Sequence, residues 1–372
     1  MKDLLEHADL SRYAGQFVWL ELNYDTPGNR PFMTQFGAMA TPTFYVIDPQ
    51  GERVTATQTG AMSLTELQQF LERGRSAMLA KSQTPADAAL VRGDGLLTEH
   101  PADAVKAYQD ALHLAPAGWP RHDLAVASEV QALQDSNQLE PCADLAASEA
   151  AHMKRDDLFT RTVVAGMWCV AGADPTPWAN ADLAKLQPMA EEALKLPTTV
   201  RDHRDAIYRT LMNISVARND KTAAGKWGDR WLAELDAIKP TNDDQRSALD
   251  IARVENIQVY GDAERILPAL RDSERLMPNS YIASLRLAQV ELDAEHYDEA
   301  IAACNRGLAR NPGASGRAWI LQIKASAFTM EGKSVEAREA LQKALEAAQE
   351  IPTNMRNMTI ENISKKLKAA GG

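Results

Sequence analysis

The sequence of 372 residues contains only three cysteines, Cys142, Cys169 and Cys304, and none of them belongs to a Cys-x-x-Cys pair. So few and so distant cysteines form no zinc pattern and no disulfide framework, and we expect three buried thiols. No apolar run approaches 18 residues, which excludes a membrane-spanning helix. Basic residues are also in deficit, with 40 Lys and Arg against 51 Asp and Glu. The resulting net charge of −11 disfavours nucleic acid as a partner.

Motifs that commonly carry catalysis are missing as well. The seven histidines form no His-Glu-x-x-His pair, no serine lies in a Gly-x-Ser-x-Gly context, and no phosphate-binding Gly-x-x-x-x-Gly-Lys loop occurs. These absences predict no catalytic residue, no metal site and no cofactor in the chain as given. His203, between Asp202 and Arg204, is expected on a polar helix surface. Most of the tryptophans follow residue 118, and we expect them to pack in the core: Trp119, Trp168, Trp178, Trp227, Trp231 and Trp319.

Strand signals are confined to the first 83 residues. Runs rich in β-branched and aromatic residues occupy 17–22, 43–47 and 53–57, and turn residues separate them. The segment 48–51, Asp-Pro-Gln-Gly, predicts a tight turn between two antiparallel strands, because proline fixes φ early and glycine allows a positive φ later. Ser63 and Glu66 fit a capping box for a helix that continues to about residue 78. Before the hairpin, the predicted order is a helix at 3–12, a strand at 17–22 and a short helix at 29–36.

From residue 84 onward the sequence predicts helices alone. Ala, Leu, Glu, Arg and Gln dominate segments of about 12 to 18 residues. The last four of the prolines that end such segments are 43, 38 and 34 residues apart. This spacing is typical of helix-pair repeats, in which no unit can bury its apolar face alone. The segments end at Pro116, Pro197, Pro240, Pro278 and Pro312.

The repeats resemble tetratricopeptide repeats. In that family a small residue is followed by an aromatic residue four positions on, a small residue three further on, and a proline after five more. Ala104, Tyr108, Ala111 and Pro116 match all four positions. Between residues 119 and 278 the pattern predicts amphipathic helices, either as degenerate repeats or as plain helical hairpins. Two weaker copies near the C-terminus keep the small residues: Ala300, Cys304 (at the aromatic position), Gly307 and Pro312 in one, and Ala325, Ala337 and Ala344 in the other.

The N-terminal segment resembles the second half of a thioredoxin fold, over about residues 1–80. Residues 39–54 carry the resemblance, with Thr-Pro-Thr before an apolar strand, a glycine-containing turn and a second strand. Residues 17–22 resemble the preceding parallel strand of that family. The resemblance implies that Pro42 is a cis-proline and that Thr41 and Pro42 form a loop that pairs with extended peptides.

This resemblance stops at the thiols. Thioredoxins carry Cys-x-x-Cys at the N-terminus of their first active-site helix, where the positive helix end lowers the pKa of the thiol. The present chain has no cysteine before Cys142, and its first residues resemble the interior of that helix. The strand before that helix, central in the family fold, has no counterpart. A Cys-x-x-Cys upstream of Met1, lost through a late start codon or a partial reading frame, and a truly degenerate domain are the alternatives.

Together these observations predict an α/β, incomplete thioredoxin-like domain at residues 1–83, lacking its first strand and Cys-x-x-Cys, followed by an all-α tetratricopeptide-like solenoid at 84–372. A solenoid offers an extended surface and no chemistry, so the first hypothesis is a non-redox scaffold that binds proteins or peptides. The alternative is an N-terminally truncated thiol-disulfide oxidoreductase. The composition suits a soluble bacterial-type protein, in the cytoplasm as given, or in the periplasm if a signal peptide preceded Met1.

Overall fold

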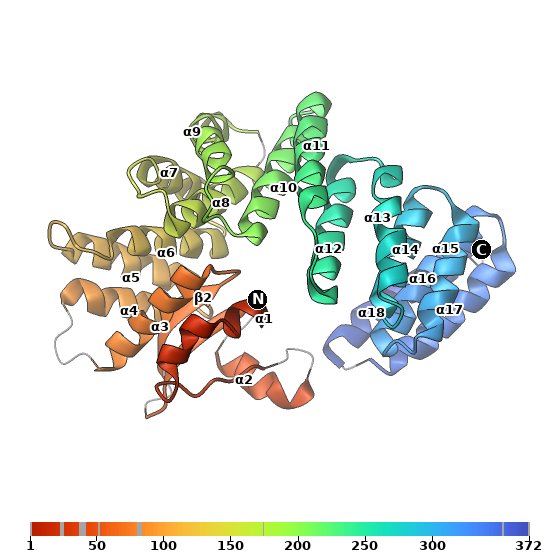
Figure 1. Ribbon diagram of the computed structural model, residues 1–372, viewed down its shortest axis with the longest axis horizontal. Helices are drawn as coiled ribbons and strands as arrows, with labels where there is room; N and C mark the ends of the chain where they lie inside the picture. Colours follow the sequence, from red (N-terminus) through yellow and green to blue (C-terminus); the bar gives the residue numbers. More distant parts are fainter. Residues whose placement is uncertain are drawn as a thin grey trace. The chain divides into compact units, whose positions relative to one another are not determined.

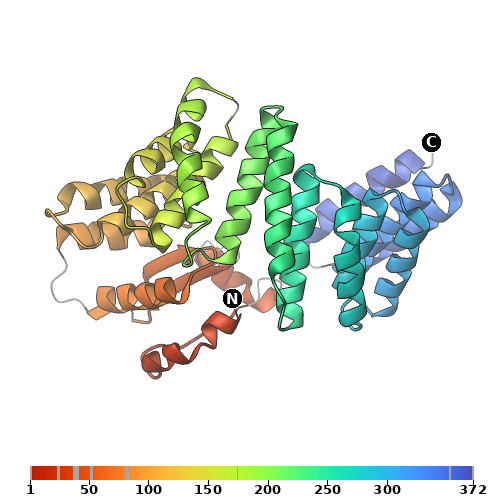
Figure 2. The ribbon, with the colours of Figure 1, turned by 45° about the horizontal axis from the view of Figure 1, so that its top comes forward.

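The computed structural model describes residues 2–22, 26–36, 42–50, 53–79, 84–173, 175–351 and 353–370. Residues 1–220 and 221–372 form two compact units, and each is described by itself. The chain is mostly helical, and within each unit successive helices fold back on one another (Figures 1 and 2). Strands among the described residues form a single two-stranded sheet near the N-terminus.

The first unit begins with short helical segments. They are α1 (Lys2–Leu5), the 3₁₀ turns η1 (Ala8–Tyr13) and η2 (Pro27–Asn29), and α2 (Arg30–Gln35). The helix predicted at 3–12 is therefore split, and the short helix predicted at 29–36 is confirmed. The strand predicted at 17–22 is wrong, because this stretch has no regular structure and Val18 is 88% exposed. A β-prone sequence makes a strand only where a partner strand satisfies its backbone groups, and the two strands of the described sheet pair with each other.

The predicted hairpin and the helix after it are confirmed. Strands β1 (Thr43–Asp48) and β2 (Arg53–Thr59) pair antiparallel, with Phe44 opposite Gln58 and Val46 opposite Ala56. Helix α3 (Leu64–Leu79) covers them. These elements are the ones that the thioredoxin resemblance implies, but two strands do not establish that fold, which stays a prediction. Their shared core contains Leu10, Tyr13, Val46, Ala56, Met62, Leu67, Phe70 and Leu71.

The remainder of the first unit is helical, as predicted. Thr84 begins this part with a capping box, accepting from Asp87 N–H at 3.1 Å. The predicted repeat residues Ala104, Tyr108 and Ala111 are fully buried on one helix. The helices are α4 (Pro85–Leu96), α5 (Pro101–Leu114), α6 (His122–Asp135), α7 (Leu139–Glu149), α8 (Asp157–Ala171), α9 (Pro177–Ala193) and α10 (Arg201–Ala217).

The second unit continues with helices that alternate between two layers. Helix α12 packs against α14 and α14 against α16, while α13, α15 and α17 each pack between their neighbours in the chain. Small residues at the predicted repeat positions, such as Ala300, Gly307 and Ala344, are buried where helices meet. The helices are α11 (Lys221–Ala237), α12 (Asp243–Tyr260), η3 (Ala263–Arg265), α13 (Leu267–Leu276), α14 (Tyr281–Asp293), α15 (Tyr297–Ala309), α16 (Ala314–Met330), α17 (Ser334–Gln349) and α18 (Thr353–Ala370).

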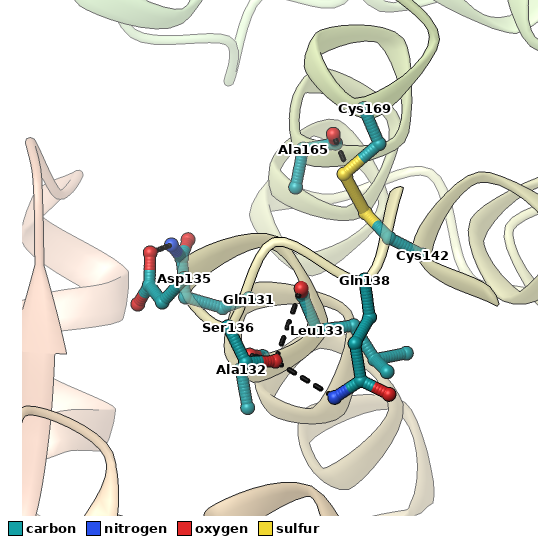
Figure 3. The surroundings of a disulfide bond; sticks show 9 residues. All are labelled: Gln131, Ala132, Leu133, Asp135, Ser136, Gln138, Cys142, Ala165 and Cys169. Atoms are coloured by element: carbon teal, nitrogen blue, oxygen red, sulfur yellow. Dashed lines mark hydrogen bonds between the residues drawn. A yellow bond between two sulfur atoms is a disulfide. The ribbon is translucent and has the colours of Figure 1, made fainter. Parts of the chain in front are cut away.

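The expectation of three buried thiols is wrong for two of the cysteines. Cys142 on α7 and Cys169 on α8 form a disulfide, and both residues are fully buried (Figure 3). Antiparallel packing of α7 on α8 brings together two residues that lie 27 positions apart. Cys304 is a free, buried thiol as expected, and burial raises its pKa to about 12.

Among the residues that the structure describes, no helix is long and apolar enough to cross a membrane.

Candidate functional site

A buried ionic network fixes the β hairpin and α3 to the first helical hairpin. Arg73 Nε on α3 lies 3.2 Å from Asp94 Oδ2 on α4, and Tyr108 on α5 donates its hydroxyl to Asp94 Oδ1 at 3.0 Å. The Thr57 hydroxyl on β2 donates to the Asp94 carbonyl at 2.9 Å. Burial raises the pKa of Asp94, and Arg73 opposes this shift. The bonds of this network join four successive elements, so we assign it a structural role.

A second buried network fixes the N-terminal end of α3 to α8. The predicted capping box is confirmed, since Ser63 Oγ accepts from Glu66 N–H at 3.2 Å and Glu66 Oε2 accepts from Ser63 N–H at 2.9 Å. Ser63 also donates its hydroxyl to Asp157, and Arg161 donates to the side chain of Gln58 on β2. Burial raises the pKa of Glu66 to about 7, against the opposing charge of Arg161.

The expectation that His203 lies on a polar surface is wrong. Its side chain on α10 is partly buried, and burial together with the positive charge of Arg161 lowers its pKa to about 4. The polar neighbours Asp202 and Arg204 favour an exposed position for His203. Its burial results from tertiary contacts, which a local window of sequence does not contain.

Buried carboxylates also join the helices of the second unit. Glu274 on α13 accepts hydrogen bonds from Arg306 on α15 at 2.7, 2.9 and 3.1 Å, and it also accepts from Ser284 on α14. Burial opposes the ionisation of Glu274, but the bonds from Arg306 and Ser284 lower its pKa. In the same way Asp250 on α12 accepts from Ser273 on α13 at 3.0 Å. These bonds fix the register of neighbouring helices. They do not involve the helix faces that point away from these contacts.

Helices α12, α14 and α16 each carry a stripe of solvent-accessible side chains at helical spacing. Two hydrogen bonds link neighbouring stripes: Arg286 on α14 donates to the hydroxyl of Ser247 on α12 at 2.7 Å, and Lys366 on α18 donates to Gln322 on α16 at 3.3 Å. Helix α14 packs directly on α16 between these two pairs. We call this surface the even-helix face. It consists of Ser247, Ile251 and Gln258 on α12, Ile282, Arg286 and Gln289 on α14, Trp319, Gln322, Ser326 and Met330 on α16, and Lys366 on α18.

Large apolar side chains stand exposed on the even-helix face. Trp319 is 61% exposed, and Met330, about three turns further along the same stripe of α16, is 62% exposed. Ile282 and Ile251 continue the apolar surface on α14 and α12. Side-chain amides such as Gln289 and Gln322 lie between these apolar groups. Apolar anchors among amides that can pair with peptide groups suit an extended polypeptide and provide no reactive group.

Sequence reasoning missed the most prominent residue of this face. Trp319 was expected in the core, as was Trp168, which is 46% exposed, and the expectation is wrong for both. It is right for Trp119 and Trp231, which are buried. A helical projection of α16 would have found Trp319, because it shares a stripe with polar Gln322 and Ser326 and lies opposite the apolar face.

The peptide-binding loop that the thioredoxin resemblance implies lies mostly outside the described residues. Thr41 is outside them, as are residues 80–83 at the predicted domain boundary, and the Thr41–Pro42 bond is therefore not described. Pro42 accepts from Gly60 N–H at 2.9 Å, beside the start of β1. The role predicted for Thr41 and Pro42, and the domain boundary at 83/84, stay predictions.

In the described part of the chain, no group of three or more His, Cys, Asp or Glu side chains is placed to hold a metal ion.

Comparison with known proteins gives one family match. Residues 206–365 match the family described as "Tetratricopeptide repeat-like domain". No curated protein matches the chain. A solved tetratricopeptide repeat protein from Parabacteroides merdae ATCC 43184 is similar over 78% of this chain and 100% of its own, with 10% identity and a TM-score of 0.44. The TPR2AB domain of yeast Sti1, solved as a complex with pHSP90, is similar over 77% of this chain and 98% of its own, with 14% identity and a TM-score of 0.31.

Both structural likenesses are distant. The family match begins within α10 of the first unit and runs through the helices of the second unit into α18, and α15 and α17 bury small residues at the predicted repeat positions. Residues 206–365 therefore form a tetratricopeptide repeat-like domain.

Proposed function

We propose that this protein is a scaffold that binds an extended segment of a partner protein on the even-helix face. The exposure of Trp319 carries the proposal. Burial of a tryptophan removes more apolar surface from water than burial of almost any other side chain. Aromatic anchors accordingly supply a large share of the binding energy at protein interfaces. Ile282 on the neighbouring helix and Met330 extend the same surface.

The side chains of the even-helix face indicate which groups its partner must present. Ile251, Ile282 and Trp319 would receive apolar side chains of the partner, and the amide oxygen of Gln289, whose nitrogen donates to Asp293, would accept from its backbone. The carboxylates that bridge the helices, such as Glu274, are already paired with arginines, so they hold the face rigid and do not take part in binding. A rigid face loses little conformational entropy when a partner binds.

A peptide library displayed on phage and selected against the purified protein tests the proposal. Peptides selected on the wild type should contain an aromatic or large aliphatic residue, and their affinity should fall about 30-fold in Trp319→Ala, as expected for an aromatic anchor. Trp168→Ala is the matched control, because it removes an exposed tryptophan from α8 in the other unit. Failure to select peptides, or equal losses in both variants, would contradict the proposal.

The disulfide extends the proposal to the compartment. Disulfides persist in oxidising environments and are rare where thiol reductants are abundant. Cys142 and Cys169 are fully buried in their disulfide, so we place the working protein in an oxidising compartment.

The peptide-binding loop at Thr41 and Pro42 is retained as a second, separate proposal, tested by the geometry of the Thr41–Pro42 bond.

A further inference from the structure

A hollow of about 370 Å³ lies in the second unit, between the N-terminal half of α11, the C-terminal end of α12 and η3. Its lining includes Gly225 and Gly228 from α11, Tyr260 from α12, and Asp262 just beyond it. None of the lining residues belongs to the even-helix face. The hollow is therefore a separate site, independent of the even-helix face.

Two glycines keep this hollow open. Gly225 and Gly228 lie inside α11, where each glycine weakens the helix by about 1 kcal/mol relative to alanine. A Cβ atom on Gly225 would meet only Cε1 of Tyr260, at an ordinary 3.7 Å, so helix packing does not demand a glycine there. Asn256 on α12 donates to the Gly228 carbonyl at 3.0 Å and fixes the two helices across the hollow.

Among the described residues that line the hollow, one carboxylate, that of Asp262, is not neutralised by an ion pair. Asp229 and Asp262 supply two carboxylates, and Arg265 pairs with Asp229. Helix α12 ends here with its last backbone carbonyls, and Gly261 continues in an extended conformation, with φ −169° and ψ 176°. Those carbonyls form the negative pole of the helix. The ring of Tyr260, 37% exposed, adds an aromatic surface of the kind that attracts cations.

We infer that this hollow binds a small organic cation, an alkylammonium group on a slender aliphatic stem. The ammonium group lies between Asp262 and the C-terminal carbonyls of α12, and the stem lies over Gly225 and Gly228 beside Tyr260. Asp262 is suited to this role, because its Oδ1 accepts from Glu264 N–H at 3.0 Å while its Oδ2 accepts no hydrogen bond from the residues that the structure describes. A free amine and a lysine side chain share this chemistry, and the test separates them.

Titration of glycine-selectively ¹⁵N-labelled protein by NMR measures the binding directly. The probes are butylammonium, spermidine, and Nα-acetyl-lysine amide, with butanol as the uncharged control. Saturable shifts of the Gly225, Gly228 and Gly261 signals with the ammonium probes, and none with butanol, are expected. Tighter binding of spermidine identifies a free amine as the ligand, and tighter binding of the lysine amide identifies a protein side chain.

Two substitutions locate the site. Gly225→Leu fills the hollow and should abolish saturation, whereas Ala233→Leu, at an exposed position of the same helix, should leave it unchanged. Asp262→Asn should weaken binding about three- to ten-fold, and Asp244→Asn at the opposite end of α12 should not. Equal shifts with butanol, no saturation, or unchanged binding in Gly225→Leu would overturn the inference. The selected peptides of the proposed function remain bound in all four variants, so the two proposals fail independently.

Discussion

Cys142 on α7 and Cys169 on α8 are joined by a disulfide in the interior of the first unit, and neither residue is exposed. The bridge closes a loop across the α7–α8 hairpin, and its ends are 27 positions apart in the sequence. In the chain-entropy model, a loop of this length stabilises the folded state by about 3–4 kcal/mol. The α7–α8 hairpin is therefore held by a covalent bond as well as by packing.

Thiol counting checks this bridge. In denaturant without reductant, one cysteine per chain should react with a thiol reagent, because only Cys304 is free. After reduction, three should react. Cys304→Ala is the control and should give none before reduction and two after it. Three reactive thiols in protein purified without reductant would show that Cys142 and Cys169 are not bridged, and would remove the argument for an oxidising compartment.

Local signals predicted the elements of this fold well. The capping box of Ser63 and Glu66 needs only two residues three apart, and the structure forms it. A proline also predicts a helix end from the local sequence alone, because it cannot continue a helix. Helices α5, α11 and α15 end two to three residues before Pro116, Pro240 and Pro312. Small residues at the repeat positions likewise predict close helix contacts from the local sequence alone.

Features that depend on tertiary neighbours were not predicted. The pairing of Cys142 with Cys169 requires the α7–α8 hairpin to place two Cβ atoms face to face, which sequence spacing does not encode. Residues 17–22 have strand propensity but no partner strand in the described sheet. Trp319 is a different case, because its apolar character suggests the core but a helical projection of α16 places it beside polar Gln322 and Ser326.

Gly93 and Gly95 on α4 give a matched pair of substitutions. A Cβ atom on Gly93 would lie 2.4 Å from Cε1 of the buried Tyr108, whose hydroxyl is fixed by Asp94. Gly93→Ala should therefore lower the free energy of unfolding by about 1–3 kcal/mol through overpacking. On Gly95 a Cβ atom would meet only the Val54 carbonyl at 3.6 Å. Gly95→Ala should be neutral or stabilising by up to about 1 kcal/mol, and urea midpoints that rank the variants in the reverse order would contradict the packing of α4 on α5.

His203 should make the protein sensitive to acid. Its pKa in the folded state is about 4, lowered by burial and by Arg161, whereas in the unfolded chain it is near 6.5. As the pH falls from 6.5 toward 4, the unfolded state takes up the proton first, so stability is lost across this window. His203→Gln removes the titration, and its urea midpoint should fall less than that of the wild type between pH 7 and pH 4.5. Parallel curves for the two proteins would show that His203 is solvated.

Glu66 should have the opposite effect on stability over an overlapping range of pH. Burial raises its folded pKa to about 7, against an unfolded value near 4.5, because Arg161 and the Ser63 N–H compensate only part of the lost hydration. The unfolded state therefore releases its proton first, and stability is lost as the pH rises from 4.5 to 7, by on the order of 3 kcal/mol. Glu66→Gln keeps an oxygen that can accept from Ser63 N–H and carries no charge.

The comparison of Glu66→Gln with the wild type by urea unfolding isolates this proton. The two proteins should be about equally stable at pH 4, and the variant should be the more stable at pH 7.5. Glu72→Gln, on the same helix, is the control of opposite sign. The hydrogen bond from Arg75 lowers the pKa of Glu72, so its stabilisation is present above the unfolded pKa and is lost as the pH falls. Glu72→Gln should thus be less stable than the wild type at pH 7.5. If the wild type is more stable than Glu66→Gln at pH 7.5, ionised Glu66 forms a stabilising ion pair with Arg161, and that ion pair joins α3 to α8.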